Sequence, residues 1–513
     1  MTEGGGAARR PPALLVVLAV VIAVIMLAPV AQLIVRALGS GGRHAAAILF
    51  RQRTLELFGN TLLLAVLVSA ACLVLGVAIA VATVRVRLPF RPLWPVLACL
   101  PLAVPSFVGA FAWSSALPQL HGLGPLVIVT VLTTVPLVTV PTIGALALAD
   151  HGLADVARTL GRSRSSAFFS VTLPQILPAA VTGTLLVALY TISDFGSPAI
   201  LRYETLTTGV YALFSGGIDR SASAVTSLAL VAFALVLVLG ERRLRGDRAG
   251  ADPGSVQRGQ TARPLGTLSA LACGAGLGLV AALGVLAPLI AMTVRWLSSE
   301  RFGSTMEDLA AATVTTLLLG AVAGTVTVVL ALPIGVLAAR YRSRLIALAE
   351  SVSYLTHAIP GVVVALALVA LSLALVPAAY QSAAALIAAY VVLCFSLAIG
   401  ALRSAIARVP PRLEEVSRTL GHGPFFTWWR VTARTALPGI VAGWVLVATA
   451  VMKELPATLM LRPIGVDTLA TELWSKTSIG AYGAAAPIGV LLVLVGLVPA
   501  MMLAATLYEG ARR

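Results

Sequence analysis

Charged side chains are scarce in this sequence, and several kinds of site are absent with them. Only 11% of the 513 residues are Asp, Glu, Lys or Arg, and the only lysines are Lys453 and Lys476. Neither ends a G-x-x-x-x-G-K-[ST] loop, so the sequence holds no phosphate-binding loop of this type. The four cysteines stand singly in apolar runs and the five histidines are scattered. We therefore expect no disulfide framework and no metal site, and no catalytic cluster points to an enzyme.

What the sequence has instead is apolar length. Hydrophobic residues make up 59% of it, and the mean hydropathy is +0.99. A helix of about 20 apolar residues crosses a bilayer. We predict an all-α membrane protein with about twelve transmembrane helices, and we interpret the first apolar run as a retained span, not a signal peptide. The predicted limits are 13–36, 60–84, 92–115, 125–148, 177–199, 222–241, 265–294, 312–338, 350–376, 383–402, 437–460 and 485–508.

The basic residues indicate how the chain is oriented. The net charge is +16, but the arginines lie in short clusters between apolar runs, a pattern that does not predict a nucleic-acid partner. Most of them fall in alternate connections, which the positive-inside rule places in the cytoplasm together with both termini. One such connection, 242–264, is rich in Arg, Gly and Pro and is predicted to be a flexible linker.

The two halves of the chain repeat each other. Residues 155–178 and 415–438 are identical at nine of 24 positions without a gap, and 103–110 resembles 358–365. A further pair is 74–87 with 331–344. Because six predicted spans separate the copies, the two six-helix repeats are parallel. We predict two permease-like domains, 56–241 and 309–508, preceded by 1–55 and 265–308, each holding one span and an outer loop.

The repeated polar segment reads as a short helix, a turn and a second helix. Leu153 to Leu160 is compatible with a helix that Gly161 ends, and Phe168 and Phe169 lie on the second piece. By itself such a segment also fits an interfacial amphipathic helix held to lipid headgroups. Lipid binding, however, does not require one gapless spacing in two copies.

That spacing resembles the "EAA" loop of ABC importer permeases. The loop reads Glu-Ala-Ala, three residues, Gly, nine residues and Ile-x-Leu-Pro. The first copy matches it at Ala157, Gly161, Leu173 and Pro174 and has Asp155 in place of the Glu. The second copy matches it with Glu415, Ser417 and Gly421 but has Ala433 and Arg434 in place of Leu-Pro. The chain therefore resembles two fused permease units of the type I importer fold.

The resemblance implies partners. The two loops would be coupling helices that dock on an ABC ATPase subunit, in two copies, carried on another polypeptide. An extracytoplasmic solute-binding protein would deliver the cargo, and the chain would lie in the bacterial cytoplasmic membrane. No cofactor is implied.

The acids predicted to lie within spans are Asp194 and Glu454, with Lys453 beside the latter. An ionisable group within a span is costly and usually faces a cavity or a partner. One interpretation is an internal Lys453–Glu454 or Asp194–Lys453 pair that fixes helix packing. The other is that the acids line a translocation path for a cationic cargo.

The cargo follows only from resemblance. The stretches SDFGSPAILRYET (193–205) and KELPATLMLRP (453–463) are similar to those of ferric-iron importer permeases. Related permeases serve thiamine, polyamines or phosphonates. A different class, the secondary transporters, also has twelve spans in two parallel halves. Those proteins, however, carry their basic motif after the second span, whereas here the structured loop follows the fourth.

Overall fold

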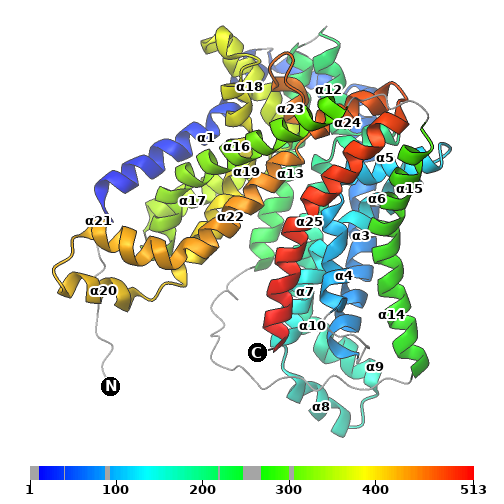
Figure 1. Cartoon of the computed structure of the whole chain (residues 1–513), viewed down its shortest axis with the longest axis vertical. Helices are drawn as coiled ribbons and strands as arrows, with labels where there is room; N and C mark the ends of the chain where they lie inside the picture. The colour runs from blue at the N-terminus through cyan, green and yellow to red at the C-terminus, as the bar shows by residue number, and fades with distance from the viewer. Residues whose placement is uncertain are drawn as a thin grey trace. The chain divides into compact units, whose positions relative to one another are not determined.

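The computed structural model describes residues 11–39, 41–86, 93–217, 220–245, 267–299, 306–341 and 343–512. Their regular structure is helical (Figure 1). Within these residues ten helices are long and apolar enough to cross a membrane, or eleven if the bent pair Leu93–Ala103 and Ser106–Ala116 counts as one span. The prediction of an all-α membrane protein is confirmed.

Two of the twelve predicted spans are broken helices, which accounts for the lower count. The first, 92–115, bends by 83° between Leu93–Ala103 and Ser106–Ala116. The second, 350–376, is divided into α17 (Arg344–Leu355), η5 (Thr356–Ala358) and α18 (Gly361–Leu375). Both breaks fall at a proline, Pro105 or Pro360, and the residue before each is extended. A proline forces that conformation on its predecessor by steric clash, so one local cause acts in both halves.

The chain divides into two compact units, each assembled from distant parts of the sequence. Unit 1 contains residues 1–41 and 312–468, and unit 2 contains 42–311 and 469–513. The predicted domain boundaries stay a prediction. Of the predicted linker, residues 246–264 lie outside the described residues, while α13 continues to Arg245.

Unit 1 is held together by close helix packing. Helix α1 (Ala13–Gly39) packs against α17 and α18, and α19 (Ala383–Ala407) packs against α22 (Arg434–Met452). A Cβ on Gly439 or Gly443 of α22 would lie 2.6 Å from a Cβ of α19. Small residues allow helices in a membrane to approach this closely. Helix α16 (Met306–Arg340) contacts α22, where Trp444 donates a hydrogen bond to Thr325 at 3.0 Å.

Unit 2 has two packed groups. Helices α3 (Gln52–Arg85), α7 (Pro136–Leu148) and α10 (Leu173–Ser193) pack against one another. Helix α25 (Tyr482–Arg512) packs against α15 (Ala287–Leu297) and α24 (Leu469–Ser478), and also against α4 (Leu93–Cys99) and η1 (Leu100–Ala103). The other long helices are α5 (Ser106–Ala116), α6 (Leu123–Thr134), α12 (Leu206–Ser215), α13 (Arg220–Arg245) and α14 (Thr267–Ala281).

Candidate functional site

The first repeated loop, in unit 2, is a helix–turn–helix. Helix α8 (His151–Thr159) begins after Asp150, whose side chain accepts a hydrogen bond from the Gly152 N–H at 2.8 Å. Gly161 ends the helix with φ +87. Its N–H bonds to the Arg158 carbonyl, and the Arg162 N–H reaches back to the Ala157 carbonyl at 3.1 Å. This is the Schellman turn that a glycine permits. The chain continues through α9 (Arg164–Ala167) and the π-helical turn η2 (Phe168–Thr172) into α10.

The second loop, in unit 1, has the same local structure. Helix α20 (Pro411–Thr419) is followed by Gly421 with φ +83, then by α21 (Pro424–Thr427) and the π-helical turn η7 (Trp428–Ala433). The same two hydrogen bonds close the turn, from Gly421 to Arg418 and from His422 to Ser417. The helix–turn–helix predicted for both loops, with a glycine at each turn, is confirmed.

Both loops expose large apolar side chains at corresponding positions. On α8 and α20 they recur three and then four residues apart, which places them along one helical face. Leu160 is 79% exposed and Leu420 is 70% exposed. The matched exposed pairs are Leu153, Val156, Leu160 and Phe169 in the first loop and Leu413, Val416, Leu420 and Trp429 in the second, each pair 260 positions apart. The second loop also exposes Phe425 and Phe426, where the first loop has Ser165 and Ser166. A matched apolar face of this kind suits a partner surface.

The other predicted loop residues lie beneath this apolar face or beside it. Ala157 is buried in the first loop, and Ser417, its counterpart, shares a 2.9 Å hydrogen bond with Thr427. Asp155 is exposed and lies 3.5 Å from the Arg158 guanidinium. Leu173 and Pro174 form the first turn of α10, as their place at the end of the loop predicts.

Sequence reasoning missed one residue of the second loop. It singled out Glu415, but the buried acid is its neighbour Glu414, which lies in the first turn of α20. The first loop has Ala154 at the corresponding position, so a comparison of the two copies could have singled out Glu414 as an acid present in only one of them.

The acid of the second half, Glu454, follows the end of α22 and binds the start of a short helix. One carboxylate oxygen accepts a hydrogen bond from the Ala457 N–H, and the other accepts from the N–H and the hydroxyl of Thr458, at 2.9–3.0 Å. Both oxygens therefore cap α23 (Pro456–Leu461). The ion pairs of the described residues do not include Lys453, so the predicted Lys453–Glu454 pair is not what positions the carboxylate.

The acid of the first half, Asp194, follows α10 in the same way but is less well satisfied. Its Oδ1 accepts a 3.4 Å hydrogen bond from the Ser197 N–H, at the start of α11 (Gly196–Ile200). Within the described part of the chain its buried Oδ2 makes no hydrogen bond of normal geometry, and neither does the hydroxyl of Ser197, although the Ser106 and Ser197 hydroxyls and the Gly196 N–H lie near the carboxylate. Asp194 thus retains an acceptor that Glu454 does not.

The two acids differ in length, and the residue that begins the nearby helix differs in size in the opposite sense. The break before α5 carries Ser106, whose hydroxyl accepts a 2.9 Å hydrogen bond from Tyr190. The corresponding break before α18 carries Gly361, where a Cβ would lie 2.7 Å from Oε1 of Glu454. The longer acid therefore occurs with the smaller neighbour, and each repeat places its carboxylate beside the start of the helix that follows the break.

The comparisons with known proteins agree with this repeated geometry. The family model described as "binding-protein-dependent transport system inner membrane component" matches the chain twice, over residues 73–241 and 331–509. The chain belongs to this family. It is the permease component of a transport system, and the resemblance to fused double permeases of ABC importers is confirmed.

Individual relatives extend the match over nearly the whole chain. The Fe(3+)-transport system permease protein FbpB 2 of Haemophilus influenzae is 32% identical over 489 residues, 93% of this chain and 94% of that protein. The ferric transport system permease protein FbpB of Actinobacillus pleuropneumoniae is 21% identical over 42% of this chain and 33% of its own. The molybdenum transport system permease protein ModB of Mycobacterium tuberculosis is 30% identical over 35% of this chain and 77% of its own.

Proposed function

We propose that this permease imports ferric iron across a bacterial cytoplasmic membrane, with energy from a separate ABC ATPase. Two copies of that ATPase dock on the two loops, an extracytoplasmic solute-binding protein delivers the cargo, and both chain termini lie in the cytoplasm. One observation carries the proposal. Two loops 260 positions apart share a glycine turn of the same geometry and expose apolar side chains at the same four positions.

A protein partner explains these loops better than lipid does. Adsorption to headgroups requires only an apolar face and some basic residues. A docked subunit, in contrast, requires a defined surface in each half and a rigid connection to the spans that must move. The Schellman turns and the π-helical turns join each loop directly to α10 or α22 without a flexible segment.

The proposal of ferric iron rests on the name of the Haemophilus influenzae relative and on its nearly complete coverage of the chain. Relatives named for molybdenum and 2-aminoethylphosphonate transport match much less of it. Phosphonates, thiamine and polyamines remain the alternatives of the same class, and the ModB relative adds molybdenum to them.

We further propose that Asp194, Glu454 and Lys453 lie along the translocation path. Asp194 supports this most directly, since its buried Oδ2 makes no hydrogen bond of normal geometry among the described residues. Glu454 has both oxygens engaged with α23, so its role is to orient the backbone around the path. For the same function we retain 56–241 and 309–508 as the two permease domains.

The test is reconstitution. The permease is co-expressed with a candidate ABC ATPase and solute-binding protein from the same genome, purified, and placed in liposomes. Uptake of radiolabelled ferric iron bound to the binding protein should require hydrolysable ATP, and unlabelled molybdate, thiamine or spermidine should not compete. Uptake that continues without the ATPase and follows a proton gradient would identify a secondary transporter and refute the proposal.

A further inference from the structure

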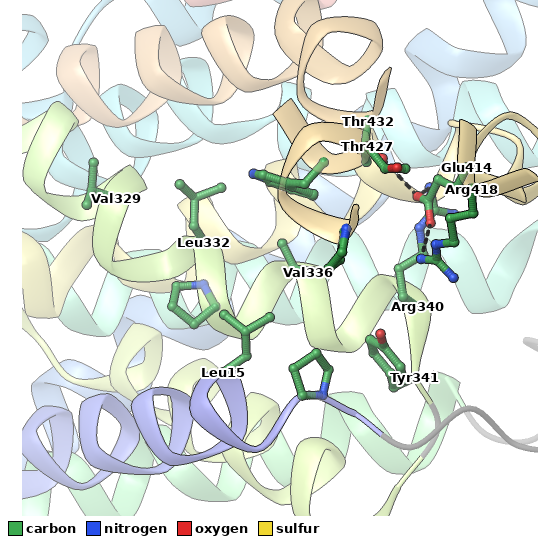
Figure 2. Close-up of a pocket in the computed structure, with 14 residues that line it drawn as sticks. Leu15, Val329, Leu332, Val336, Arg340, Tyr341, Glu414, Arg418, Thr427 and Thr432 are labelled. Atoms are coloured by element: carbon green, nitrogen blue, oxygen red, sulfur yellow. Dashed lines mark hydrogen bonds and ion pairs between the residues drawn. The ribbon is translucent and has the colours of Figure 1, made fainter. Parts of the chain in front are cut away.

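The buried carboxylate of Glu414 joins three elements of unit 1. Its Oε1 accepts a 2.9 Å hydrogen bond from the Thr432 hydroxyl and lies 2.8 Å from Nη2 of Arg340. Its Oε2 lies 3.7 Å from Nη2 of Arg418, one turn along α20. Figure 2 shows these side chains converging. We call Glu414, Arg340, Thr432 and Arg418 the Glu414 network. It connects the end of α16, the start of α20 and the turn η7 that leads into α22.

The two central side chains of the Glu414 network are largely buried. The side chains of Arg340 and Glu414 are only 13% and 11% exposed, whereas that of Arg418 is 42% exposed. Among the described residues the buried Nε and Nη2 of Arg340 have no hydrogen-bond partner, so the Glu414 carboxylate offsets the charge by proximity and not through an aligned hydrogen bond. An ion pair with this burial contributes little net stability, because both charges have lost their hydration. It does, however, strongly disfavour any geometry in which either charge is left unpaired.

Apolar side chains do not completely fill the space between α16 and the second loop. Beside the network lies a groove of about 320 Å³, whose walls come from the start of α1, from α16, and from α20 to η7. Leu15, Val329, Leu332 and Val336 line its apolar part in Figure 2. The Glu414 network lines the polar end of the same groove, where the ion pair links α20 directly to the end of α16.

Among the described residues of the first half no ion pair corresponds to that of Glu414 with Arg340, although its loop has the same backbone. At the positions corresponding to Glu414 and Thr432 it has Ala154 and Thr172. Pairing 74–87 with 331–344 places Thr83 at the position of Arg340, and the Thr83 hydroxyl bonds within its own helix, to the Ile79 carbonyl.

A second polar contact of the second loop is replaced in the same way. The Ser417–Thr427 hydrogen bond has as its counterpart Ala157 and Ala167, which are both buried. The repeats thus share the loop geometry but differ in how the loop is fastened.

We infer that Glu414 and Arg340 are positioning residues that make α20 and α16 move as one body when the second coupling loop is displaced. Displacing α20 against α16 would separate two buried charges, so force applied to the second loop reaches α16 as well as α22. At the position of Glu414 the first loop has Ala154, whose side chain cannot form this ion pair. This inference rests on the proposed function, in which ATPase subunits dock on both loops.

The test compares variants that copy the first half into the second. Glu414→Ala and Arg340→Thr each break the ion pair, and the double variant Arg340→Thr/Glu414→Ala removes both charges. In proteoliposomes with the ATPase and binding protein, the readout is the amount of cargo imported per ATP hydrolysed. We expect this ratio to fall by about fivefold or more in each single variant, the lower range of coupling between distant sites. The ATPase should still co-purify, since the exposed face of α20 is unchanged.

The double variant separates positioning from stability. If the network only stabilises the fold, removing both charges should restore the thermal midpoint and the import ratio together. If it transmits motion, the midpoint recovers and the ratio stays low. A matched control is Glu350→Ala, which breaks the ion pair of Arg403 with Glu350 between α17 and α19 of the same unit and should leave the ratio unchanged.

The outcomes distinguish the two proposals. A wild-type ratio in both single variants, recovery of the ratio in the double variant, or an equal loss in Glu350→Ala would each overturn the inference. Should Glu414→Ala fail to fold, Glu414→Gln keeps the hydrogen bond of Thr432 without the charge and is measured in its place. Failure of the unaltered permease to bind any ATPase refutes the proposed function itself.

Discussion

Gly421 provides the sharpest test that the second loop is a docking element. Its φ of +83 lies in the left-handed region, and a Cβ added there would meet no atom within 4 Å. A side chain is therefore opposed by backbone strain alone, which costs about 1–2 kcal/mol for a residue with a Cβ. If the turn changes instead, the bonds from Gly421 to Arg418 and from His422 to Ser417 are lost. The exposed side chains of α20 would then point in different directions.

We therefore expect Gly421→Val to weaken ATPase binding by about 5–30-fold, the factor that one or two kcal/mol gives. Gly421→Asn is the matched control, because asparagine adopts the left-handed conformation more readily than other non-glycine residues. It should retain most of the affinity. The assay is titration of purified ATPase onto the permease in nanodiscs, with membrane insertion checked by yield and thermal midpoint.

The contrary results are also informative. Equal loss in Gly421→Asn and Gly421→Val would mean that the partner approaches the glycine closely and that side-chain volume, not conformation, matters. Wild-type affinity and uptake in Gly421→Val and in Gly161→Val would refute the coupling assignment, since Gly161 has the same open surroundings and a φ of +87.

Three further predictions concern the carboxylates and the packing. Asp194→Asn combined with Glu454→Gln should lower uptake while ATPase assembly persists, and unchanged uptake would mean that the acids only pack. Gly361→Ser should lower the thermal midpoint by crowding Glu454, an overpacking cost of about 1–3 kcal/mol. Adding Glu454→Asp should restore the midpoint, because the double variant copies Ser106 and Asp194 of the first half. A midpoint that stays low would contradict the compensation in size between the acid and its neighbour. Gly496→Ala should destabilise unit 2 severely, because its Cβ would lie 1.9 Å from the Ala103 carbonyl oxygen. In the control Gly278→Ala the new Cβ meets nothing within 4 Å, so this variant should be neutral or slightly stabilising. Equal thermal midpoints for the two variants would contradict the packing of α25 on η1.

Much of the fold was predictable because its signals are local. The spans follow from apolar length, and the loop turns follow from glycines at 161 and 421, whose conformational freedom is a property of one residue. The bends at Pro105 and Pro360 had a local signal too, in the proline itself. The hydropathy of the surrounding segments nevertheless suggested continuous spans, since hydropathy does not register direction.

The candidate site was only partly predictable. The coupling loops were found by repetition, and the acids were found because a charge in an apolar run is conspicuous. Glu414 was missed, since its importance depends on Arg340, which lies 74 positions earlier at the end of another helix. The partner of Glu454 was also misjudged: Lys453 is adjacent in sequence, but the backbone of α23 supplies the hydrogen bonds.

The amino-acid sequence alone determined that this chain is helical, lies in a membrane and contains one unit twice, since hydrophobic length and internal repetition are properties of a linear string. Only the tertiary structure decided which charges are buried, how each carboxylate is satisfied, and that Glu414 links the second loop to α16. Burial and pairing depend on atoms brought together from distant positions. For that reason two loops alike in sequence and backbone differ at Glu414 in what holds them.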